Sequence, residues 1–73
     1  NMSAQLSNED KVSIIQTHMK NLQYSKFNLE ISVVEESAKK EPGDLAIASL
    51  NTQLDDIQKQ LTALQQELDK VTP

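Results

Sequence analysis

The chain has 73 residues, a formal net charge of −4 and 37% hydrophobic residues, with no cysteine, one glycine and no arginine. Disulfide scaffolds, zinc ribbons and glycine-rich phosphate loops are therefore excluded, and an acidic chain without arginine is a poor ligand for nucleic acid. No apolar run approaches the roughly 18 residues that a membrane span requires, so we expect neither nucleic acid nor a membrane as a partner.

A proline and a glycine divide the chain into two helices. Proline disfavours the helical conformation of the residue before it, so Glu41-Pro42-Gly43-Asp44 is the predicted turn. Ser7 is a suitable N-cap for the first helix. The predicted fold class is all-α, an antiparallel two-helix hairpin of coiled-coil type. We predict a frayed segment over residues 1–6 and a single helical-hairpin domain over residues 7–71, with a helix 7–40, a turn 41–44 and a helix 44–71.

The first predicted helix is apolar on two sides. Its first stripe comprises Val12, Ile15, Met19, Leu22, Leu29 and Val33. Its second stripe comprises Tyr24, Phe27, Ile31, Val34 and Ala38. At 100° per residue the two stripes lie roughly 120° or more apart. A single partner helix covers only one of these sides, so the other is left for a further interaction.

The second predicted helix carries one unbroken apolar stripe at heptad spacing. Its members are Ile47, Leu50, Leu54, Ile57, Leu61, Leu64, Leu68 and Val71. Pairing residues across the turn predicts which side chains form the core of the hairpin. This intra-hairpin core comprises Tyr24, Phe27, Ile31, Val34, Ile47, Leu50, Leu54, Ile57, Leu61, Leu64 and Leu68. The alternative for the two aromatic residues, Tyr24 and Phe27, is an anchor for a protein partner.

The apolar residues left without a partner form a predicted self-association face of Leu22, Leu29 and Val33, with Leu22 shared with the core. Burying a side chain of this size stabilises by about 1.5–3 kcal/mol, and two-helix hairpins without disulfides or metals are marginally stable. We therefore expect a homodimer that forms a four-helix bundle. The alternatives are a monomeric hairpin with a few exposed apolar residues, pairing with a helix of a different protein, and a higher oligomer.

No catalytic, cofactor-binding or metal-binding residues are predicted, and we expect the chain not to be an enzyme. The lone His18 has only Ile14, Ile15, Asn21 and Leu22 at helical spacing, none of which completes a metal site. Lys26 lies where the first stripe would continue between Leu22 and Leu29. Either it is a polar seam residue that sets register or oligomeric state, or the stripe changes face there, and both interpretations stand.

A set of residues in the first helix resembles short uncharacterised helical proteins of marine tailed phages, cyanophages especially. The resemblance rests on residues 6–11, 14–15, 18, 20–22, 24, 26 and 28–30, within residues 6–36. It implies a small phage accessory protein of unknown role. We expect an intracellular, soluble protein, located in the host cytoplasm or associated with the virion if the resemblance holds.

Three functions are consistent with these patterns. The first is a structural or interaction module, a helical hairpin that self-associates and presents a helix face to a protein partner. The second is an assembly chaperone or adaptor that holds a helical segment of a client. The third is an inhibitor or regulator that mimics a helix of its target through acidic residues such as Glu30 and Glu35.

Overall fold

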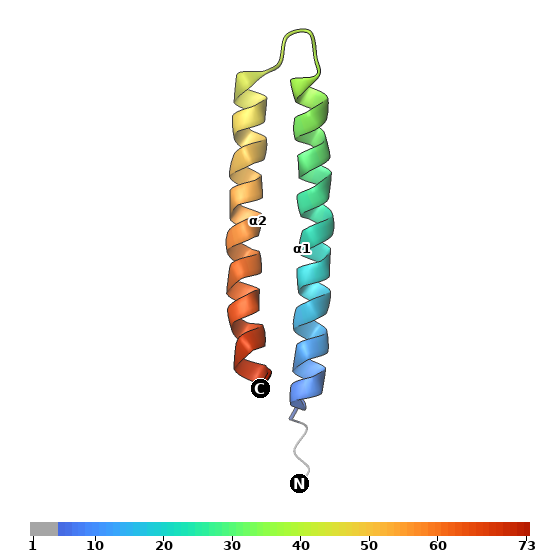
Figure 1. Ribbon diagram of the computed structural model, residues 1–73, viewed down its shortest axis with the longest axis vertical. Helices are drawn as coiled ribbons and strands as arrows, with labels where there is room; N and C mark the ends of the chain where they lie inside the picture. The colour runs from blue at the N-terminus through green and yellow to red at the C-terminus, as the bar shows by residue number, and fades with distance from the viewer. Residues whose placement is uncertain (1–4) are drawn as a thin grey trace.

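The computed structural model describes residues 5–73, which form two long antiparallel helices joined by a short loop (Figure 1). Helix α1 spans Asn8–Ser37 and helix α2 spans Asp44–Val71. The helices lie side by side along a rod of 64 × 19 × 15 Å, so the molecule is one helix thick. The predicted all-α hairpin is confirmed. Of the predicted frayed segment 1–6, residues 1–4 lie outside the described residues.

Ser7 is the N-cap of α1, as its position in the sequence predicts. Its Oγ accepts a hydrogen bond from the Asp10 backbone N–H at 3.0 Å, and its own backbone N–H donates to Asp10 Oδ2 at 3.4 Å. This reciprocal capping box satisfies two backbone donors that a helix start leaves without partners. The acidic side chains of Glu9 and Asp10 also suit the positive end of the helix dipole.

Helix α1 ends at Ser37, three residues before the predicted end at Lys40. The last turn tightens, because the Lys39 N–H bonds to the Glu36 carbonyl only three residues back, at 3.3 Å. A loop between antiparallel helices must cross the roughly 8–10 Å between their axes. Residues 38–43 make this crossing, so α1 ends at Ser37, before Pro42 would interrupt it.

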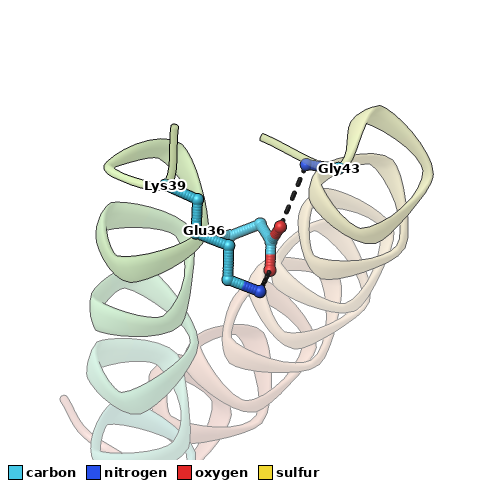
Figure 2. A network of polar contacts seen from close by, with 3 residues as sticks. All are labelled: Glu36, Lys39 and Gly43. Carbon is cyan, nitrogen blue, oxygen red and sulfur yellow. Dashed lines mark hydrogen bonds and ion pairs between the residues drawn. The ribbon is translucent and has the colours of Figure 1, made fainter. Parts of the chain in front are cut away.

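The carboxylate of Glu36 accepts a hydrogen bond from the N-cap residue of α2, as Figure 2 shows. Gly43 is the N-cap residue of α2 and has no side chain to accept a hydrogen bond. Its backbone N–H donates to Glu36 Oε2 at 2.9 Å, while Lys39 Nζ lies 3.0 Å from Glu36 Oε1. The hydrogen bond from Gly43, followed by the contact with Lys39, lowers the pKa of Glu36 below its ordinary value of 4.5.

Acidification is expected to weaken this turn. Because the pKa of Glu36 is lower in the folded chain than in the unfolded chain, its contribution is complete above pH 4.5 and is lost as pH falls through the folded pKa. Glu36→Gln should therefore lower the melting temperature at pH 7, and the gap to wild type should narrow as the pH falls below 4.5. Thermal melts followed by circular dichroism test this, with Glu35→Gln as the charge-matched control. A gap that is independent of pH would contradict it.

The core of the molecule is a single seam between α1 and α2. On α2 the seam comprises Ile47, Leu50, Leu54, Ile57, Leu61, Leu64, Leu68 and Val71. On α1 it comprises Val12, Ile15, Met19, Leu22, Lys26, Leu29, Val33 and Glu36. Both sets alternate steps of three and four residues, so they stay in register along the antiparallel pair. All are half-buried except Leu61, which is 8% exposed.

Leu61→Ala should destabilise the hairpin more than a surface change of the same chemistry. Leu61 is the one buried hydrophobic side chain among the described residues, and truncating a core leucine costs about 2–5 kcal/mol. Leu45→Ala is the matched control, because Leu45 is 88% exposed on the same helix and its loss should cost no more than about 0.5 kcal/mol. Urea unfolding of both variants measures the difference in the free energy of unfolding, and equal losses would contradict the assignment of Leu61 to the core seam.

Candidate interaction surface

Four large apolar side chains lie exposed in one row on α1. Tyr24, Phe27 and Val34 are each 63% exposed and Ile31 is 42% exposed. We call this row the outer stripe. Its steps of three, four and three residues place it at the b and f positions of the heptad whose a and d positions form the seam. These positions lie about 150° around the helix from the seam, so α2 cannot cover them.

The structure therefore reverses the roles predicted for the two faces of α1. Tyr24, Phe27, Ile31 and Val34 were expected inside the hairpin, but their exposure places them outside it. The predicted self-association face of Leu22, Leu29 and Val33 is half-buried in the seam. The physical reason is continuity, because the first stripe runs in heptad register along the whole of α1 whereas the outer stripe covers only part of it. The α2 residues of the predicted core do lie in the seam.

Lys26 keeps the first stripe continuous. It is half-buried at a seam position, and its Nζ donates to Gln58 Oε1 on α2 at 3.1 Å. A lysine can lay its methylene stem along an apolar surface while the ammonium group reaches a polar partner. Of the two interpretations left open by the sequence, the structure thus supports a polar seam residue, because the stripe does not change face at this position.

The outer stripe carries different charges at its two ends. One turn before Tyr24, the ammonium group of Lys20 lies 5.6 Å from the centre of the tyrosine ring, within cation–π distance. At the other end, Glu35 is exposed next to Val34, and Glu30 is exposed next to Ile31 near the middle of the stripe. The stripe is therefore apolar along its length, cationic at the end nearer the N-terminus of α1 and anionic at the other.

His18 lies beside the seam and away from the outer stripe. It borders a shallow groove with Leu22 and Ser25 of α1 and with Ala63 and Leu64 of α2. Over residues 5–73, no three His, Asp or Glu side chains gather closely enough to hold a metal ion. The groove is lined by apolar side chains together with the small side chains of Ser25 and Ala63. Its lining includes no carboxylate that could pair with the imidazole of His18 in acid–base catalysis.

Comparison with known proteins gives no relative, since no family model, curated protein or solved structure matches the chain. Within the described residues, neither helix has a stretch that is both long and apolar enough to cross a bilayer. The outer stripe contains four of the seven large hydrophobic side chains that are exposed in the described residues. It is therefore the candidate functional site.

Proposed function

We propose that this chain is a small non-enzymatic structural and interaction protein that self-associates through the outer stripe. The observation that supports the proposal is the exposure of Tyr24, Phe27, Ile31 and Val34, each between 42% and 63% exposed at heptad spacing. Such a row is the sequence pattern of a helix that packs against another helix. Isolated exposed apolar residues are common on proteins, but a contiguous row is characteristic of an interface.

The energetics favour association of a hairpin this small. Near 70 residues, a single core supplies only a few kcal/mol of net stability, and oligomerisation is one of the common ways to add to it. Two copies that cover each other's outer stripe bury eight large side chains that the hairpin leaves exposed. The resulting assembly has four helices, two from each copy, and we propose that it is a homodimer.

The same module is compatible with the phage origin that the resemblance of residues 6–36 implies. In that setting we propose an accessory protein of the host cytoplasm or of the virion. The proposed role is binding to another helix, because the outer stripe offers exposed apolar side chains with charged residues at its ends. The proposal thus assigns no substrate, cofactor or metal to the chain.

Sedimentation equilibrium over a hundredfold range of concentration tests the proposal. We expect the mass to rise from the monomer value of 8.2 kDa towards twice that value. Tyr24 gives a local readout, because it is the only tyrosine and the chain has no tryptophan. Its fluorescence should become less accessible to acrylamide as the dimer forms. A folded monomer with an accessible Tyr24 at all concentrations would contradict self-association and leave the stripe for a helical client.

A further inference from the structure

The charges around the outer stripe specify how a second copy would lie on it. Lys20 lies over the ring of Tyr24 at one end of the stripe, Glu35 lies beside Val34 at the other end, and Glu30 lies near the middle beside Ile31. The remaining flanking positions are neutral amides, namely Asn21, Gln23 and Asn28. A partner that matches this surface needs an apolar row of similar length with the charges in the opposite order.

Building on the self-association proposed above, we propose that two copies pack antiparallel through their outer stripes, about a two-fold axis at the level of residue 29. This arrangement places Tyr24 of each copy opposite Val34 of the other, and Phe27 opposite Ile31. Lys20 of each copy then lies at the level of the acidic end of the other, within reach of Glu35. The symmetry makes this charge contact twice, and the opposed helix dipoles favour the same direction.

A parallel arrangement would bring like charges together at both ends of the stripe. When the residues of the outer stripe are counted as the a and d positions, Glu30 is at a g position and Glu35 at an e position. A parallel dimer would therefore place Glu30 of each copy next to Glu35 of the other copy. It would also bring the two Lys20 side chains together. The antiparallel arrangement leaves one like-charge pair, between the two Glu30 side chains at the axis. The balance of charges therefore selects the antiparallel orientation.

The position of the stripe also determines the shape of the dimer. Because the outer stripe lies about 150° from the seam, the two α1 helices lie in the middle and the two α2 helices lie outside them. The four helices form a layer in the order α2, α1, α1, α2. The polar outer surface of α2 stays in solvent, with its ion pair between Lys59 and Asp55 at 3.2 Å. This open layer takes the place of the four-helix bundle expected from the sequence, because its four helices do not surround one common core.

A single spin label distinguishes the two orientations. Ser13 is exposed in line with the outer stripe but beyond its apolar part, and the chain has no cysteine of its own. A nitroxide attached to the Ser13→Cys variant allows the distance between the labels of the two copies to be measured by pulsed electron–electron double resonance. In the antiparallel dimer this distance should be roughly 50 Å, because each label lies 16 residues from the level of the axis and an α-helix rises 1.5 Å per residue. A parallel dimer would give less than about 20 Å. A short distance overturns the orientation, whereas a monomer mass with no distance overturns self-association itself.

Charge reversal gives an independent test of the same contact. Lys20→Glu should raise the dimer dissociation constant roughly five- to tenfold, because two exposed charge contacts become repulsive. Adding Glu35→Lys should restore the wild-type constant, since the contact is made again with its charges exchanged. Lys59→Glu is the control on α2 and should leave the constant unchanged. A double variant that is weaker than Lys20→Glu alone would contradict the antiparallel contact.

Discussion

Replacing Leu29 and Val33 together by glutamate is expected to unfold the hairpin. Both side chains are half-buried in the seam between α1 and α2. Removing a core leucine side chain costs up to about 2–5 kcal/mol, and the loss of Val33 and the unpaired carboxylates add to that cost. A domain of this size has only a few kcal/mol of net stability, so the double variant should lose it all. Far-ultraviolet circular dichroism at 25 °C measures the loss of helix.

The opposite outcome would restore the roles first predicted for the two faces. If the chain with Leu29→Glu and Val33→Glu kept its helix content and lost only its dimer mass, these residues would be a self-association face. The seam would then have to use the outer stripe. The experiment therefore decides between two arrangements of the same helix, and wild type measured at the same concentration is its reference.

The second large effect is expected from the opposite side of the same helix. Phe27→Glu with Val34→Glu should leave the hairpin folded, because both side chains are 63% exposed. A dimer would have to bury four unpaired carboxylates in place of four apolar side chains. We expect the dimer dissociation constant to rise more than about a hundredfold, which is equivalent to about 2.7 kcal/mol. Sedimentation equilibrium beside circular dichroism measures mass and folding separately.

The two double variants are matched controls for each other. Each replaces two apolar residues of α1 by glutamate and changes the net charge equally, so general effects of charge on solubility or helix propensity cancel. One is expected to lose the fold and the other only the assembly. If Phe27→Glu with Val34→Glu unfolded the chain, the outer stripe would belong to the core and the proposed interface would be wrong.

The sequence predicts most of the hairpin because its signals are local. Ser7 and Asp10 stand at the spacing of a capping box, and α1 begins there. Pro42 and Gly43 place the turn, and α2 begins at Asp44 directly after them. The stripe of α2 is unbroken, so only one side of that helix can face the core.

The faces of α1 could not be assigned in the same way, because two polar residues occupy its seam. Lys26 interrupts the apolar row between Leu22 and Leu29. The half-burial of Lys26 and its hydrogen bond to Gln58 show that the row continues. Glu36 occupies the last seam position and bonds to the backbone of Gly43. Both contacts join residues that are distant in the sequence or lie across the turn. A heptad count that allowed polar members would have identified the seam.

Intermolecular nuclear Overhauser effects would test the central claim most directly. A mixed sample of isotope-labelled and unlabelled chains shows only contacts between copies. We predict contacts from the ring of Phe27 in one copy to the methyl groups of Ile31 in the other, together with contacts between Tyr24 and Val34. Intermolecular contacts from Leu22, Leu29 or Val33, or none at concentrations where the mass is that of a dimer, would contradict association through the outer stripe.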